Sequence, residues 1–127
     1  MKTVSWNCRG LGNHPKEEAM KDLIRISNPD ILIIQKTKME EQTLLHSRKN
    51  YWKKGGGIVV SSRGASGGIG TLWDSSKFDL VSSDMCTHWI LTEILQKDTG
   101  LKVSIFNIYV PVLFPEKELV GITSRST

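Results

Sequence analysis

The first 38 residues show three successive patterns of apolar and polar side chains. Residues 2–8 alternate between apolar and polar side chains, which predicts a strand. From Pro15 to the "SNPD" segment the apolar residues follow helical spacing, which predicts an amphipathic helix. Residues 31–34 are all apolar and predict a strand buried on both faces. A strand, a helix and a second strand in this order predict a βαβ unit, whose two strands run parallel.

The predicted βαβ unit brings polar residues together at one edge. In open α/β sheets, ligands bind beyond the carboxyl ends of the strands. Here the first strand ends near Asn7, and the second ends at Gln35 and Lys36. We therefore expect an amide and a lysine, far apart in the sequence, to lie close together at this edge.

The rest of the chain changes to short alternating segments separated by glycines and polar turns. Residues 39–50 predict a second short helix, and "QKDTGLK" predicts a hairpin turn. We expect a further helix to begin within residues 111–120 and a frayed tail over residues 120–127. The predicted strands cover residues 55–62, 67–74, 78–83, 88–96 and 101–110. These elements together predict an α/β fold with a large antiparallel component.

Composition narrows the class of protein. The 127 residues are enough for one domain, and 39% hydrophobic with 24% charged residues indicates a folded globular chain. No apolar run approaches the length of a membrane span, so we expect no membrane partner. We identify no secretory signal. Cys8 and Cys86 form neither a disulfide framework nor a zinc-binding spacing. We expect an intracellular protein, either nuclear or cytoplasmic.

Positive charge is concentrated in the first half of the chain. The net charge is +4, and residues 1–63 contain 12 Lys and Arg against 6 Asp and Glu. Residues 64–127 contain 5 basic and 7 acidic residues. A basic half favours a polyanionic partner such as nucleic acid, although an ordinary solvated surface explains the same charges.

Four segments carry a resemblance to a known family. "SWNCRGLGN", "DILIIQKTK", "SGGIGTLWD" and "NIYVP" occur in this order. Together they resemble the endonuclease/exonuclease/phosphatase superfamily, which has the deoxyribonuclease I fold, and most nearly the endonuclease domain of plant LINE-type retrotransposons. The resemblance covers residues 1–119 and only the amino-terminal half of the family's domain. It implies a partial four-layer α/β sandwich of mixed β-sheets with flanking helices.

The resemblance also implies a chemistry, which is hydrolysis of nucleic acid phosphodiesters with Mg²⁺ as Lewis acid. Asn7 matches the asparagine of the family's active-site hydrogen-bond network, and Tyr109 matches the tyrosine that contacts the scissile phosphate. Lys36 stands where the family has its metal-binding glutamate. Arg9, Lys36 and Lys38 are the predicted nucleic-acid-binding residues, with DNA as the family's partner.

Lys36 changes what this chemistry predicts. Magnesium prefers hard oxygen ligands and commonly takes one or two carboxylates from a protein. Two unit charges about 4 Å apart interact by about 4 kcal/mol at an effective dielectric of 20, so a divalent ion facing Lys36 meets about twice that as repulsion. The family's later Asp-x-Asn and Asp-His motifs are not found in this sequence. We expect no bound Mg²⁺ and no hydrolysis.

Each candidate residue also has a simpler explanation. Asn7 and Arg9 suit a turn after a strand, Tyr109 suits a core, and Lys36 suits a solvated surface. "RKNYWKK", residues 48–54, fits either base stacking or an amphipathic strand with snorkelling lysines. "GASGG" matches G-x-S-x-G, but the helix that a nucleophile elbow requires does not follow it.

Three hypotheses for the whole chain remain open at this stage. The first is an inactive endonuclease-type domain of retroelement origin. The second is a non-catalytic nucleic-acid-binding remnant, whose affinity would fall steeply with salt. The third is a decayed or truncated gene product with no selected role.

Overall fold

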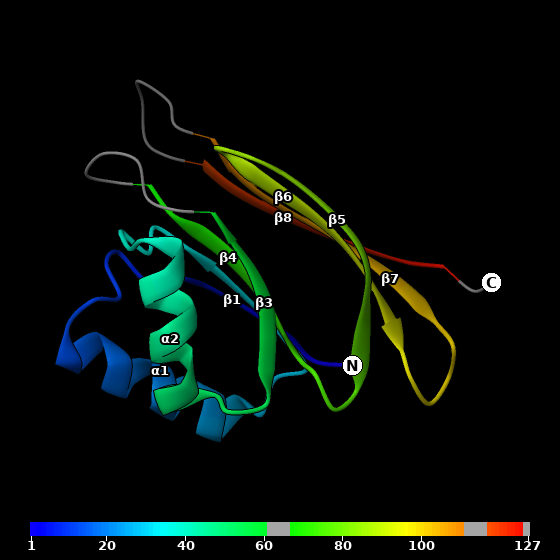
Figure 1. Ribbon diagram of the computed structural model, residues 1–127, viewed down its shortest axis with the longest axis horizontal. Helices are drawn as coiled ribbons and strands as arrows, with labels where there is room; N and C mark the ends of the chain where they lie inside the picture. The colour runs from blue at the N-terminus through cyan, green and yellow to red at the C-terminus, as the bar shows by residue number, and fades with distance from the viewer. Residues whose placement is uncertain (61–66, 111–116, 126–127) are drawn as a thin grey trace.

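The computed structural model describes residues 1–60, 67–110 and 117–125. Within these ranges the chain forms two four-stranded sheets and two helices. Figure 1 shows both helices on one side of the first sheet and the second sheet on its other side. Neither helix is long and apolar enough to cross a membrane. The predicted α/β class is confirmed.

The first sheet, called sheet A, contains the predicted βαβ unit. Its strand order is β1-β2-β4-β3, and β1 and β2 are parallel, as expected. Asn7 pairs with Gln35 at the carboxyl ends of these two strands. β2 pairs with β4, and β4 with β3, in antiparallel fashion. The bounds are β1 Thr3–Asn7, β2 Ile31–Gln35, β3 Gly55–Val60 and β4 Ile69–Asp74.

Helix α1, His14–Ser27, begins and ends as its sequence predicts. The Asn13 Oδ1 atom accepts a hydrogen bond of 3.0 Å from the Lys16 backbone N–H, which caps the first turn. Asn28 ends the helix with a φ of 45°, in the left-handed region that helix C-caps favour. Helix α2, Glu41–Tyr51, lies beside α1 on the same face of sheet A.

The second sheet, called sheet B, is wholly antiparallel in the order β5-β6-β7-β8. Strand β8 corrects the sequence-based expectation for residues 117–125, because a strand covers the last four residues of the segment predicted to begin a helix and most of the predicted frayed tail. Residues 111–116 and 126–127 lie outside the described residues. The bounds are β5 Phe78–Cys86, β6 Trp89–Gln96, β7 Lys102–Val110 and β8 Lys117–Arg125.

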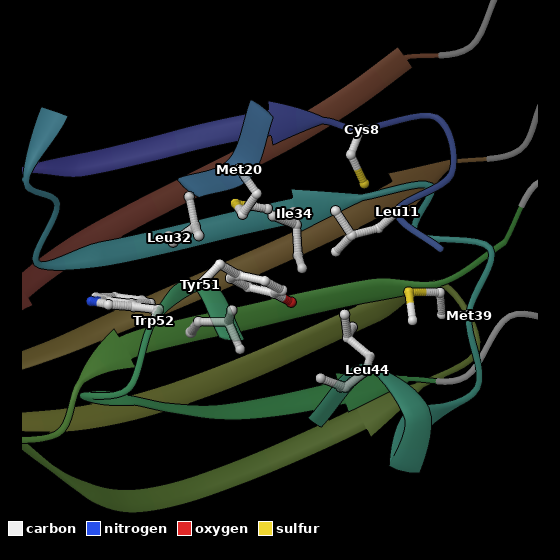
Figure 2. Packing of buried hydrophobic residues seen from close by; sticks show 11 residues of the cluster. Cys8, Leu11, Met20, Leu32, Ile34, Met39, Leu44, Tyr51 and Trp52 are labelled. Carbon is white, nitrogen blue, oxygen red and sulfur yellow. The ribbon is translucent and has the colours of Figure 1, made fainter. Parts of the chain in front are cut away.

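Strand β2 lies at the centre of the packing, and all five of its residues are buried. Leu32 and Ile34 point to the helix side, where they pack with Met20 and Leu44 (Figure 2). Residues of the other face point toward sheet B, forming a second cluster of Ile31, Ile33, Trp73, Phe78, Ile94, Val103 and Ile105. The prediction of a strand buried on both faces is confirmed, and its carboxyl end emerges from a rigid core.

Candidate functional site at the carboxyl end of sheet A

Backbone hydrogen bonds continue the β1–β2 pairing beyond the ends of the strands. The Cys8 N–H donates to the Gln35 carbonyl (3.0 Å), and the Gly10 N–H donates to the Lys36 carbonyl (2.7 Å). The Leu11 N–H then donates to the Thr37 carbonyl (2.9 Å). The loop after β1 therefore lies along the loop after β2, and Asn7 and Lys36 come to one edge as predicted.

A third segment joins the same edge from the start of β4. The Thr37 N–H donates to the Gly68 carbonyl (3.0 Å), and the Lys38 N–H donates to the Gly67 carbonyl (2.9 Å). Gly68 has a φ of +100°, and a Cβ atom there would collide with Thr37 Oγ1. The close approach therefore requires glycine at position 68. Three segments from distant parts of the sequence are held together by their backbones.

Three cations at this edge share an uncommon backbone conformation. Arg9, Lys36 and Lys38 have φ angles of 49°, 55° and 55°. L-residues avoid this left-handed region, which costs about 1–2 kcal/mol each. Arg9 and Lys38 are exposed, Lys36 is partly buried, and the Lys38 side chain passes close to Gly10. Sparsely populated conformations tend to gather at functional sites, so this cluster is a candidate binding surface.

Asn7 and Gln35 face the space between the two sheets. Trp6 and Ile34, the preceding residues, pack on the helix side, so Asn7 and Gln35 point the opposite way. Asn7 Oδ1 and Gln35 Oε1 are buried and have no hydrogen-bond partner among the described residues. A buried carbonyl oxygen without a donor costs about 1–3 kcal/mol. The edge therefore has two buried acceptors without a hydrogen-bond donor among the described residues.

Tyr109 faces the same end of the space between the sheets, from strand β7. It is 4% exposed and packs with Ile69 and Ile90. Ile69 pairs with Gln35 across β4 and β2, so Tyr109 and Asn7 approach one row of residues from opposite sheets. Asn7 lies two strands from Ile69, which is about 10 Å. The structure thus places Asn7 and Tyr109 at the same end of the space between the sheets, while their functional roles stay predictions.

Sequence reasoning missed a buried amide pair behind these residues. Gln35 Nε2 donates to Asn107 Oδ1 (2.9 Å) and to the Ile108 carbonyl (2.9 Å). Asn107 Nδ2 donates to the Gly70 carbonyl (3.1 Å) and to Thr71 Oγ1 (3.3 Å). Gln35 and Asn107 are 1% and 0% exposed. A polar residue within an otherwise apolar strand was the only sequence signal of this link.

The donor set at the edge does not fit Mg²⁺. It combines two neutral amide oxygens with the ammonium group of Lys36, whereas magnesium needs hard, preferably anionic oxygen ligands. Within the described part of the chain, no three His, Cys, Asp or Glu side chains are grouped to hold a metal ion. This edge therefore offers positive charge and amide groups but no carboxylate from the β1 and β2 strand ends.

The "RKNYWKK" segment lies at the other end of sheet A. Residues 48–51 form the end of α2, which agrees with the helix predicted over residues 39–50 and excludes the amphipathic strand there. Tyr51 and Trp52 are 7% and 8% exposed and belong to the helix-side cluster, with Trp52 at the end opposite Cys8 and Met39 (Figure 2). Burial raises the pKa of Tyr51 to about 12. Both aromatic rings are core residues and are not available to stack on bases.

Comparison with known proteins supports the fold. No protein-family model matches the chain, and no curated protein sequence matches it. The AP endonuclease LMAP from Leishmania major has a similar structure, with a TM-score of 0.63 and 16% identity over 87% of this chain and 40% of the endonuclease. A humanized TDP2 from D. rerio (TM-score 0.49, 16% identity) aligns over 100% of this chain and 51% of its own. ANGEL2, a 2′,3′-cyclic phosphatase, has a TM-score of 0.44 and 10% identity, and the alignment covers 84% of this chain and 35% of ANGEL2.

The first of these comparisons establishes the architecture of this chain. This chain has a mixed α/β fold similar to that of the Leishmania AP endonuclease. In this chain two sheets pack face to face, and both helices lie on the outer side of sheet A. The chain spans less than half the length of that enzyme. The predicted deoxyribonuclease I-like fold is confirmed at this level.

Proposed function

We propose that this chain is the amino-terminal part of an endonuclease/exonuclease/phosphatase-type domain of retroelement origin, and that it binds nucleic acid without hydrolysing it. The order of the four sequence motifs and the fold shared with an AP endonuclease support the ancestry. One observation carries the change in function. Lys36 directly follows β2, and the sequence resemblance matches it to the family's metal-binding glutamate, so an ammonium group replaces a carboxylate.

Binding would use the phosphate groups of the nucleic acid. Arg9 offers a planar guanidinium that matches a phosphate with two parallel hydrogen bonds, while Lys36 and Lys38 act as point charges. Asn7 and Tyr109 lie behind these cations, between the sheets. Because three backbone segments hold the cations' main chains in place, less conformational entropy is lost when a phosphate binds.

The residues at this edge do not supply the groups that phosphodiester hydrolysis requires. A phosphodiester needs a positioned nucleophilic water and stabilisation of the leaving group, which a divalent ion supplies in metal-dependent nucleases. Lys36 offers positive charge to a phosphate but neither binds such an ion nor activates a water. We therefore propose that DNA is held and not cut.

Salt dependence of DNA binding tests this proposal. A short fluorescein-labelled single-stranded DNA is titrated with the protein in EDTA, and fluorescence anisotropy gives the affinity between about 50 and 200 mM salt. Three phosphate contacts predict a slope of about −2 for log K against log salt. A slope near zero, or no binding at low salt, would contradict the proposal and favour a product with no selected role.

A plasmid assay tests the absence of hydrolysis separately. Supercoiled plasmid incubated with the protein and Mg²⁺ should stay supercoiled, as in the no-protein control. Nicking that disappears with chelator and with Asn7→Ala would show that the edge supports metal-dependent catalysis after all.

A further inference from the structure

The peptide group that joins Ile108 to Tyr109 is held at both ends. Its carbonyl oxygen, on Ile108, accepts a 2.9 Å hydrogen bond from Gln35 Nε2. Its N–H, on Tyr109, donates a 2.7 Å hydrogen bond to the His88 carbonyl. His88 directly precedes β6 of sheet B, whereas Gln35 belongs to β2 of sheet A. A side chain of one sheet therefore fixes the backbone of the other, directly beside Tyr109.

Asn107 fixes the orientation of the Gln35 amide. Each side-chain amide nitrogen has two N–H donors, and both residues use both of them. If the Gln35 amide were turned over, its oxygen would face two other acceptors, Asn107 Oδ1 and the Ile108 carbonyl. The bonds therefore permit one orientation, and they connect β2, β7 and β4 in a fully buried position.

The surrounding contacts between the sheets are less directional. Ile33, Phe78 and Ile94 pack by apolar contact, and such packing holds the sheets together without defining their relative position as sharply as hydrogen bonds do. The hydrogen bonds of Gln35 define the relative position of the two sheets close to Asn7, because Gln35 pairs with Asn7 in the β1–β2 ladder.

We infer that Gln35, oriented by Asn107, is a positioning residue that sets the place of Tyr109 relative to Asn7. The inference rests on the proposed function to the extent that Asn7 and Tyr109 contact the bound phosphate. Gln35 itself lies behind them, and its free Oε1 acceptor is buried. Its effect on binding therefore passes through the Ile108–Tyr109 peptide group.

Fluorine NMR tests the link without any ligand. The chain has two tyrosines, so protein labelled with 3-fluorotyrosine gives one signal from Tyr109 and one from Tyr51, which lies in the helix-side cluster and serves as reference. Gln35→Leu should shift or broaden the Tyr109 signal and leave the Tyr51 signal in place. Ile33→Val, on the same face of the same strand but without a hydrogen bond, should leave both signals in place. An unchanged Tyr109 signal in Gln35→Leu overturns the inference.

A conservative exchange keeps the test decisive if Gln35→Leu does not fold. Gln35→Asn retains the amide but shortens it by one methylene, so it should perturb the Tyr109 signal because it no longer reaches the Ile108 carbonyl. Adding Asn107→Gln can restore the bond between residues 35 and 107 but not the bond to the Ile108 carbonyl, so the Tyr109 signal should stay perturbed. A signal that returns to that of the unaltered protein would contradict the Ile108 carbonyl as the link between Gln35 and Tyr109.

DNA binding then connects the inference to function. Gln35→Leu should weaken binding of the labelled single-stranded DNA about fivefold, the effect of about one lost hydrogen bond, while Ile33→Val should leave it unchanged. If the unaltered protein does not bind the DNA, the proposed function fails but the NMR result still decides whether Gln35 positions Tyr109. If the Tyr109 signal shifts but the DNA binds equally well to Gln35→Leu, the positioning of Tyr109 stands and its contribution to DNA binding is contradicted.

Discussion

The two ends of sheet A both carry positive charge, but they carry it differently. At the carboxyl end, Arg9 lies on the loop after β1, and Lys36 and Lys38 lie on the loop after β2. Backbone hydrogen bonds join these two loops to each other and the second loop to Gly67 and Gly68. At the amino end, Lys53 and Lys54 lie in the turn between α2 and β3. Five strand residues, or about 17 Å, separate the two ends. Basic composition alone would treat them as one surface, whereas the fold makes them two.

The two ends of sheet A differ more in the backbone conformation of their cations than in their charge. Every cation of the carboxyl-end group has a left-handed backbone conformation, and Lys53 and Lys54 do not. The amino end also contains Asp30, whose carboxylate accepts a 2.7 Å hydrogen bond from Lys77 Nζ. We propose the cross-bonded carboxyl end as the binding site, whereas Lys53 and Lys54 at the amino end follow a buried aromatic pair, Tyr51 and Trp52.

The largest expected effect comes from the amino end and concerns stability. Trp52→Ala removes a buried ring from the helix-side cluster and should lower the free energy of unfolding by about 3–5 kcal/mol. Urea denaturation measures this loss, with Lys53→Ala as the exposed neighbouring control, which should change it by less than about 0.5 kcal/mol. Folded Trp52→Ala should bind DNA normally. Weaker DNA binding with unchanged stability would instead make Trp52 a stacking residue.

Glycine substitutions at the two ends should change the free energy of unfolding by a smaller amount and in opposite directions. Lys38→Gly relieves a left-handed residue, so the free energy of unfolding should rise by up to about 1 kcal/mol while DNA binding weakens severalfold. Lys53→Gly relieves nothing and should cost about 0.5–1 kcal/mol with DNA binding unchanged. Urea denaturation gives the free energy of unfolding of each variant, and fluorescence anisotropy gives its affinity for DNA. A loss of stability in Lys38→Gly would show that its conformation carries no strain.

The smallest effect is the pH dependence of the amino end. Burial raises the pKa of Asp30, but the hydrogen bonds from Lys77 Nζ and the Lys2 backbone N–H, with the charge of Lys77, outweigh it and hold the pKa below 3.8. A lowered pKa means that the ionised carboxylate stabilises the fold above pH 3.8, and that this stability is lost as the pH falls through the folded-state pKa.

Lys77→Met tests this electrostatic contribution. The variant should be less stable than the unaltered protein at pH 7, and the difference should shrink at pH values below 3.8, when thermal denaturation is followed at each pH. DNA binding at pH 7 should not change, because Lys77 lies at the amino end. A stability difference that is constant across pH would exclude the ion pair as its cause.

Local patterns predicted much of the fold for physical reasons. The apolar run of β2, the Asn13 cap and the parallel β1–β2 pair all follow from short-range periodicity and turn chemistry. The meeting of Asn7 with Lys36 followed from the general geometry of parallel strands. None of these predictions needed knowledge of how the two sheets pack.

The features that the sequence did not reveal depend on tertiary contacts. The hydrogen bonds of Gln35 to Asn107 and Ile108 span more than 70 residues and form only when the sheets dock. The left-handed conformations of Lys36 and Lys38 are imposed by backbone bonds to neighbouring loops, against the preference of lysine. Base stacking and an amphipathic strand both stayed open for residues 48–54, because their mixed pattern did not show that Tyr51 and Trp52 are buried in the helix-side cluster.

The most direct test of the account is a pair of charge reversals, one at each end of sheet A. Lys36→Glu and Lys54→Glu change the net charge equally, and both are titrated against labelled single-stranded DNA in EDTA at low salt. Because Lys36 belongs to the proposed binding site and Lys54 does not, Lys36→Glu should weaken binding by about tenfold or more and Lys54→Glu by less than about twofold. Equal weakening by the two variants would contradict a binding site at the carboxyl end of the sheet.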